Sequence, residues 1–169
     1  MSHSSERDRI LLILPCTKRK PYSSSPTWRF IIDHIGPELD HIELAAIDCI
    51  TNPITGKPFG IVPMSEEHMV VGLDETPDPE KLGSLVEAVR IRLTSIRSRF
   101  RVIVAYINVR AYWHALEEVA DEFGICLLPS VYRGAESWDT GQIGASPLGV
   151  FRKYVDELLN EISRCVASD

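Results

Sequence analysis

Three consecutive cations, Lys18, Arg19 and Lys20, stand between a strand-like run and the start of a predicted helix. The run Ile10–Leu14 is entirely aliphatic and is stopped by Pro15, which is typical of a strand buried on both faces. Helix starts expose backbone N–H groups and carry a partial positive charge, so cations just before one favour an anion site. Because the segment has no glycine that would let the backbone wrap a phosphate, side chains would have to hold the anion. The alternative is a solvated basic loop followed by a helix cap.

Polar residues also follow the other predicted strands, and ligands of open parallel sheets bind beyond the carboxyl ends of strands. Asp48 closes the second predicted strand and is the best candidate carboxylate, the alternative being an Asx-type turn residue. Asn108 and Arg110 follow the third strand, where Asn108 alternatively caps the next helix. Residues 129–133 follow the fourth strand.

The cysteines do not have the spacing of a metal site or of a disulfide framework, because Cys16, Cys49, Cys126 and Cys165 include no C-x-x-C pair. We interpret the histidines in and beside the predicted helices as structural; these are His34, His41 and His114. The sequence therefore predicts no metal and no cofactor. The stretch Arg90–Arg101 carries five arginines, which form either a phosphate-contacting face or the solvated back of a helix.

The first segment resembles the signature of archaeosine synthase, P-C-x3-K-P-Y-x2-S-x2-H. Six of its seven specified positions match with unchanged spacing, and the seventh is Trp28, where the family has His; the six are Pro15, Cys16, Lys20, Pro21, Tyr22 and Ser25. The apolar block Pro58–Pro63 is a second, softer similarity. The resemblance covers most of the chain but only the core domain of the family's longer proteins.

This resemblance implies a role in tRNA modification, in which free lysine adds to the nitrile of 7-cyano-7-deazaguanine already inserted in tRNA. It implies three partners: tRNA, a tRNA-guanine transglycosylase-like chain with a PUA domain, and a radical-SAM enzyme that releases the product. It also implies the α/β sandwich of uracil-DNA glycosylases. Because one cationic triplet on an acidic chain neutralises few phosphates, we expect this chain alone to bind tRNA weakly.

The resemblance also suggests roles for residues. Lys20 and Arg19 would stabilise charge on the nitrile nitrogen or hold the carboxylate of the donor. Cys16 would attack the nitrile to form a thioimide, the alternative being a small buried hydrophobe. Asp48 would orient the ammonium donor or accept its proton, and Tyr22 would stack on the base or donate a hydrogen bond. The remaining predicted substrate-binding residues are Pro15, Lys18, Ser25, Asn108 and Arg110.

Strand and helix patterns alternate along the chain and would position these residues. Apolar runs predict parallel strands at Ile10–Leu14, Ile42–Ile50, Val102–Ile107 and Ile125–Leu128, and helical stripes span Trp28–Ile35, Leu82–Ile96, Tyr112–Val119 and Val150–Ile162. The first helix follows Ser25 as its cap, and Gly124 closes the third. The alternation predicts a three-layer α/β/α sandwich whose mainly parallel sheet has about four strands. His68–Leu73 is expected to add a small strand, and residues 51–67 and 130–147 to form long functional loops.

The composition fits one soluble domain: 169 residues, formal charge −6 and 44% hydrophobic residues. We expect this α/β domain to span residues 9–169 after a disordered N-terminus, residues 1–8. No apolar run approaches the ~18 residues of a membrane helix, and the chain starts without a hydrophobic signal core, so we expect a cytoplasmic protein with no membrane partner.

Three other functions stay open. The first is a non-catalytic base- or nucleotide-binding module, and the second is a paralogue on the same fold that lost or altered the reaction along with the motif His. A small glycosylase is the third alternative, but residues 15–28 contain no Asp or His to activate water.

Overall fold

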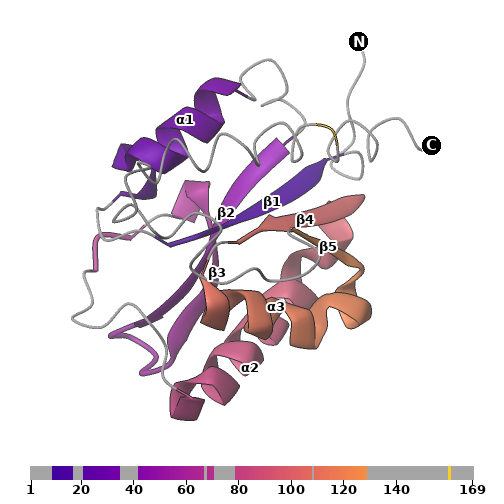
Figure 1. Cartoon of the computed structure of the whole chain (residues 1–169). Coiled ribbons are helices and arrows are strands. Elements are labelled where there is room, and N and C mark those ends of the chain that lie inside the picture. Colours follow the sequence, from indigo (N-terminus) through magenta and orange to yellow (C-terminus); the bar gives the residue numbers. More distant parts are fainter. Residues whose placement is uncertain are drawn as a thin grey trace.

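A five-stranded sheet organises the chain in the computed structural model (Figure 1). The structure describes residues 9–16, 21–34, 42–66, 68–70, 79–107, 109–128 and 160. The strands are β1 (Ile10–Pro15), β2 (Ile42–Thr51), β3 (Pro58–Pro63), β4 (Val102–Tyr106) and β5 (Ile125–Leu128). Their spatial order is β3-β2-β1-β4-β5, with β3 antiparallel to β2 and the other neighbours parallel. The predicted mainly parallel α/β sheet is thus confirmed, with five strands instead of about four.

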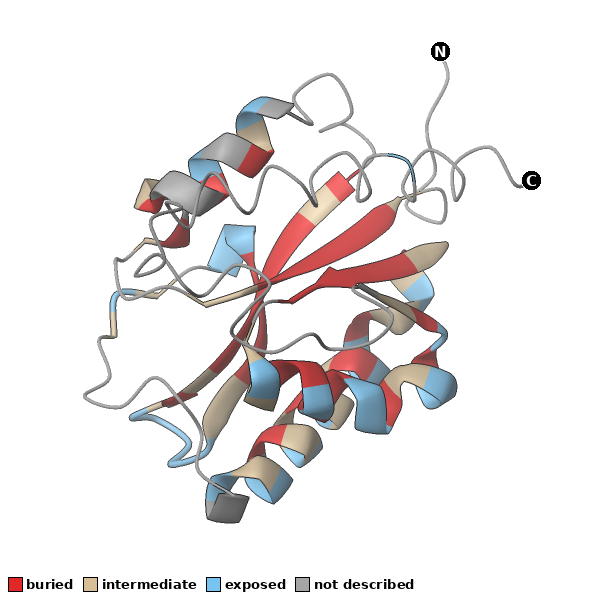
Figure 2. Ribbon diagram, viewed as in Figure 1, coloured by how far each residue is buried: buried red, intermediate tan, exposed pale blue. Residues whose placement is uncertain are grey.

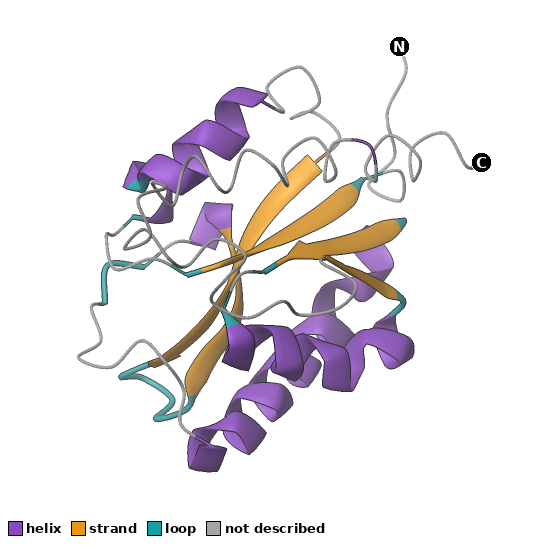
Figure 3. Ribbon diagram, in the orientation of Figure 1, coloured by secondary structure: helices purple, strands orange, loops and turns teal. Residues whose placement is uncertain are grey.

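Helices cover both faces of the sheet (Figure 3). Helix α1 (Pro26–His34) packs on one face, and α2 (Pro79–Ile96) and α3 (Arg110–Phe123) pack on the other. Successive β1 side chains alternate between the two resulting cores, and Ile10–Leu14 have no exposed surface (Figure 2). Burial on both faces explains why this strand is a continuous aliphatic run.

The predicted helix boundaries follow from local chemistry. The Ser25 carbonyl accepts the Arg29 N–H at 2.9 Å, so α1 begins at Pro26 as expected. Helix α3 ends at Gly124, which is left-handed at φ 65° and ψ 41°, a conformation that glycine adopts without steric cost.

Of the predicted extra strand His68–Leu73, the structure describes His68–Val70, which are not in a strand, and residues 71–73 lie outside the described residues. Pro58–Pro63, which we expected inside a loop, forms β3 at the sheet edge. The prolines at both ends of β3 interrupt the alternation of apolar and polar residues from which a strand is predicted. They fit there because edge strands tolerate residues that cannot donate to the ladder.

Gly60 lets β3 approach α2 closely. Its φ is 79°, and a Cβ at this position would lie 2.9 Å from the Ala88 backbone. The pairing of β3 with β2 also shifts register after Asp48↔Gly60, so Cys49 and Ile50 of β2 stand opposite Phe59 alone. This β-bulge immediately follows the candidate carboxylate.

Several sequence predictions fall outside the described residues. These are the disordered N-terminus 1–8, the functional loop 130–147 and the helix Val150–Ile162, of which the structure describes Asn160 alone. Within the described part of the chain, no helix is both long and apolar enough to cross a membrane.

Candidate functional site

Asp48 is a buried carboxylate that gathers donors from three segments. It lies within β2, three residues before the strand ends, and has no exposed surface. Its Oδ2 accepts the Tyr22 hydroxyl at 2.5 Å and lies 2.7 Å from His68 Nε2. Its Oδ1 accepts the Ile50 N–H at 2.8 Å. The predicted Asx-type contact is therefore present at Oδ1. Oδ2 joins β2 to Tyr22, which precedes α1, and to His68.

His68 is held in one orientation by its neighbours. The Val70 N–H donates to Nδ1 at 3.0 Å, so the proton of the neutral ring lies on Nε2 and points to Asp48. One ring face stacks on Phe59, with centroids 3.7 Å apart and planes 7° apart. The side chain is 11% exposed, against 0% for Asp48. Of this pair, His68 is the residue that reaches solvent.

Tyr22 and Trp28 of the motif are packing residues as well as polar ones. The Tyr22 ring stacks on Trp28 at 5.2 Å, and neither side chain is more than 1% exposed. Trp28 Nε1–H donates to the Pro15 carbonyl at 3.1 Å, which ties α1 to the end of β1. The Tyr22 ring has no exposed face on which a base could stack, and its hydroxyl donates to Asp48 and lies 3.0 Å from His68 Nε2. We name Tyr22, Asp48 and His68 the carboxylate cluster.

A second cluster, the thiol cluster, consists of Cys16, Cys49 and Tyr112. The Tyr112 hydroxyl lies 2.9 Å from Cys16 Sγ, donates to Cys49 Sγ at 3.1 Å, and accepts the Cys49 N–H at 3.3 Å. Burial raises the pKa of Tyr112 far above its ordinary value, and charge on either neighbouring sulfur would raise it further. Burial also raises the pKa of the Cys49 thiol, so this residue stays protonated at neutral pH.

The two clusters lie near the carboxyl ends of β1 and β2, on opposite faces of the sheet. Asp48 and Cys49 are successive residues of β2, and successive strand side chains point to opposite faces. The Asp48 side chain therefore joins the α1 face, where Tyr22 packs, and the Cys49 side chain joins the α3 face, where Tyr112 packs. Cys16 contacts both cores directly after β1.

The structure brings only part of the predicted site together. Cys16, Tyr22 and Asp48 lie in the two clusters, while Arg110 is exposed at the start of α3. Pro15 and Ser25 contribute backbone contacts to Trp28 and Arg29. The remaining predicted residues lie outside the described part of the chain; these are Lys18, Arg19, Lys20 and Asn108.

Sequence reasoning missed His68 and the hydroxyl of Tyr112. His68 carries no spacing signal because it lies 20 residues from Asp48 and 46 from Tyr22. Tyr112 lies on the apolar stripe of α3, where its ring is indistinguishable from a core aromatic until its 2.9 Å contact with Cys16 is known. The available signal was indirect: a polar atom buried in a core residue usually finds a partner.

Three of the five arginines in the arginine-rich stretch pair with carboxylates of the chain, and a fourth donates to backbone carbonyls. Arg90, Arg92 and Arg99 pair with Glu122, Glu66 and Glu43 respectively. Arg97 donates to the carbonyls of Phe123 and Phe100, at 2.8 and 2.7 Å. These contacts favour the solvated helix back over the phosphate-contacting face.

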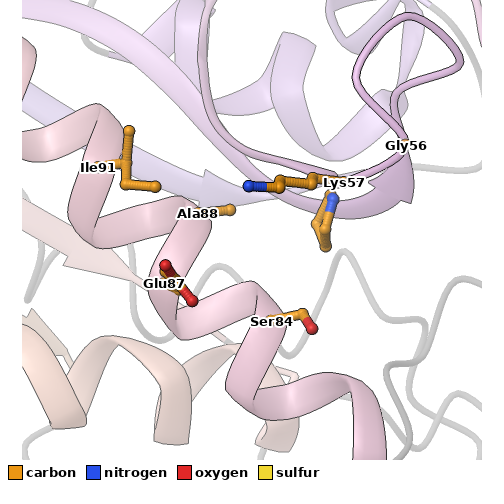
Figure 4. Close-up of a pocket in the computed structure, with 7 residues that line it drawn as sticks. Gly56, Lys57, Ser84, Glu87, Ala88 and Ile91 are labelled. Carbon is orange, nitrogen blue, oxygen red and sulfur yellow. The ribbon is translucent and has the colours of Figure 1, made fainter.

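A small pocket lies between the β2–β3 turn and α2 (Figure 4). Its volume is about 120 Å³, and the lining side chains include Lys57, Ser84 and Glu87. A wider hollow of about 520 Å³ adjoins it and is walled by Phe59, the residue stacked on His68. Phe59 thus lines the wider hollow and also contacts His68 of the carboxylate cluster. Among the described residues, no three His, Cys, Asp or Glu side chains converge as metal ligands would.

Comparison with known proteins places the chain in a family. No curated protein matches it. The crystal structure of AF0587, a protein of unknown function, is similar over 88% of this chain and 44% of its own length, with 18% sequence identity and a TM-score of 0.49. This chain thus spans less than half the length of that protein. Residues 2–131 match the family model described as a domain of unknown function (DUF5591), and the chain belongs to that family.

Proposed function

We propose that this protein is a tRNA modification enzyme that adds the amine of free lysine to the nitrile of 7-cyano-7-deazaguanine in tRNA. The single observation that carries the proposal is the contact of the motif residue Tyr22 with a buried carboxylate near the carboxyl ends of the strands, where ligands of parallel sheets bind. Tyr22 of the P-C-x3-K-P-Y-x2-S run donates to Asp48, and Trp28 packs against Tyr22. The six-of-seven match to the archaeosine synthase signature supports the choice of reaction.

Amine addition to a nitrile requires removal of a proton from the ammonium donor. Asp48 has no exposed surface and its oxygens already accept three donors, so it does not meet the amine directly. His68, which reaches solvent, takes the proton at Nδ1 when the Val70 N–H leaves this atom, and Asp48 stabilises the imidazolium that forms. The imidazole that the motif places at position 28 is thus supplied by His68, whose ring lies 5.7 Å from Tyr22.

The charge that develops on the nitrile nitrogen must also be stabilised. Lys20 and Arg19 are the cations that the motif supplies for this purpose or for the carboxylate of lysine. Cys16, at the end of β1, is the nucleophile for a covalent thioimide if the reaction passes through one. Asn108, Arg110 and Lys18 complete the proposed substrate contacts. A transglycosylase-like chain with a PUA domain would hold the tRNA, and a radical-SAM enzyme would act next.

The experiment is to incubate the protein and lysine with tRNA that carries the cyano-deazaguanine base, and to analyse the digested nucleosides by mass spectrometry. The proposal predicts a nucleoside heavier by one lysine. Absence of this adduct, with the tRNA-binding partner chain also present, would overturn it.

The second candidate is a base- or nucleotide-binding module without chemistry of its own. The observation favouring it is that each oxygen of Asp48, and Nδ1 of His68, already has a partner within the chain, as in a purely structural network. Lys20→Ala separates the two candidates. Loss of adduct formation with retained ligand binding favours the enzyme, whereas loss of binding alone favours the module.

A further inference from the structure

Cys16 and Cys49 come from adjacent strands and contact the same oxygen atom. The Tyr112 hydroxyl lies 2.9 Å from Cys16 Sγ and 3.1 Å from Cys49 Sγ. The two sulfur atoms contact the same hydroxyl oxygen and are therefore no more than about 6 Å apart. Both side chains are partly exposed, and both are in the reduced thiol form in the structure.

The backbone register places the two cysteines at a Cα separation that suits a disulfide. Pro15 pairs with Ile47 in the parallel register, and the Cys16 N–H donates to the Ile47 carbonyl at 3.1 Å, which keeps Cys16 beside β2. Cys16 is thus one residue out of register with Cys49. From the spacing of neighbouring strands and the rise per residue, their Cα atoms lie about 6 Å apart, within the range that a disulfide spans.

We propose that Cys16 and Cys49 are a redox-active pair that a hydroperoxide oxidises to a disulfide. In the first step the Cys16 sulfur attacks one peroxide oxygen, giving a Cys16 sulfenic acid and releasing water or an alcohol. In the second step the Cys49 sulfur displaces hydroxide from the sulfenic acid, and the thiol proton completes a molecule of water. The two thiols are oxidised, and the hydroperoxide is reduced in equal measure.

Cys16 is the thiol that the peroxide meets first. It follows β1 directly and precedes the cationic run Lys18-Arg19-Lys20 in sequence, and cationic neighbours favour a thiolate. Cys49 lies within β2, where burial raises its thiol pKa, so it acts as the resolving cysteine. Tyr112, whose pKa is raised still further, remains a neutral hydrogen-bonding group throughout.

The disulfide would close a chain segment that contains α1 and the carboxylate-cluster residue Tyr22. Joining the sulfurs would change both contacts that the Tyr112 hydroxyl makes with them. The modification is therefore placed where it would couple the end of β1 to β2, next to Asp48. It stands independently of the proposed function, because it needs only the two thiols and a peroxide.

The test is to treat the reduced full-length protein with hydrogen peroxide and to locate disulfides by proteolysis and mass spectrometry without reduction. We expect one linkage, Cys16–Cys49, that dithiothreitol reverses. Cys16→Ser and Cys49→Ser should each abolish it. Cys126→Ser is the matched control, because this partly buried β5 cysteine lies outside the thiol cluster, and it should leave the linkage intact.

The disulfides located in the peroxide-treated wild type test the proposal even if a variant fails to fold. Linkage of either cysteine to Cys126 or Cys165 in place of its proposed partner would overturn the proposal. So would irreversible oxidation of Cys16 with Cys49 left as a thiol, or peroxide treatment that leaves both thiols reduced.

Discussion

Asp48 and His68, 20 residues apart in the chain, meet at 2.7 Å on a carboxylate with no exposed surface. A buried carboxylate is costly unless donors surround it. Here the donors are Ile50 of its own strand, Tyr22 before α1, and His68 beyond β3. One buried side chain therefore joins three segments that lie far apart in sequence.

Replacing Asp48 by Asn should destabilise the fold markedly. The amide keeps the shape of the carboxylate but removes its charge, and it turns an N–H toward groups that themselves donate. Because the donors that face the new N–H lose their acceptor, we expect a loss of about 3 kcal/mol in the free energy of unfolding, measured by urea denaturation.

Tyr22→Phe is the matched control for that substitution. It removes one donor and leaves the stacked ring against Trp28, so the expected loss is only about 1 kcal/mol. Equal losses for D48N and Y22F would contradict the view that the carboxylate organises the cluster.

The glycines of the β2–β3 region should respond differently to a methyl group. Gly60 and Gly56 both have positive φ, but a Cβ at Gly60 would meet the Ala88 backbone at 2.9 Å, whereas Gly56 has open space around it. We expect Gly56→Ala to cost about 1 kcal/mol from backbone strain. Gly60→Ala should cost at least about 1 kcal/mol more, because β3 and α2 must move apart.

Gly83 completes this series as an internal control. It lies in α2, where a Cβ would meet nothing within 4 Å, and no left-handed backbone is involved. Gly83→Ala should therefore stabilise the protein by roughly 0.5–1 kcal/mol. The melting temperatures of the three variants should fall in the order Gly83→Ala, Gly56→Ala, Gly60→Ala. A different order in thermal unfolding would count against the described β3–α2 contact.

Stability should fall at alkaline pH because of Tyr112. Burial raises its pKa in the folded protein, while the unfolded chain ionises near the ordinary value of about 10. Above that pH the unfolded state releases a proton that the folded state keeps, so rising pH favours unfolding by about 1.4 kcal/mol per unit for this group. Cys49 acts in the same direction from about pH 9.

Tyr112→Phe isolates this effect. Without the phenol, stability should decline less steeply between about pH 10 and 11 than in the wild type, as measured by urea denaturation at each pH. At neutral pH the same variant should lose about 1–2 kcal/mol, because the Cys49 N–H loses its acceptor. Parallel pH curves for the two proteins would show that Tyr112 ionises normally in the fold.

Much of the fold was predictable because burial and periodicity are local signals. Ile10–Leu14 is aliphatic because both sheet faces are covered, and Gly124 ends α3 because a left-handed residue is needed there. The edge strand β3 escaped because Pro58 and Pro63 break the pattern on which strand prediction depends.

The sequence identified candidate site residues only where their position at the end of a predicted strand pointed to them. Asp48 was found because it follows a buried run at the carboxyl edge of the sheet. His68 and Tyr112 were not found, because their roles depend on contacts between elements far apart in sequence. A single sequence carries no spacing signal for such contacts.

Binding of tRNA by the isolated chain should be weak at physiological salt. The partly exposed arginines Arg90 and Arg92 are paired with Glu122 and Glu66, so they offer little unneutralised charge to phosphates. In a filter-binding salt series, Lys18→Ala should lower the slope of log affinity against log salt by about 1. Arg90→Ala, the matched control, should leave it unchanged. Tight, steeply salt-dependent binding that Arg90→Ala weakens would contradict this prediction.

The rate of lysine addition in a single turnover shows whether His68 exchanges the proton of the donor. Isotopically labelled lysine, the protein with its tRNA-binding partner, and tRNA bearing the cyano-deazaguanine base would be sampled over time by mass spectrometry, for wild type and His68→Gln. We expect a labelled adduct with the wild type and formation at least about 100-fold slower with His68→Gln, because the proton-exchanging imidazole is gone. No adduct with the wild type, or equal rates for the two folded proteins, would contradict this expectation.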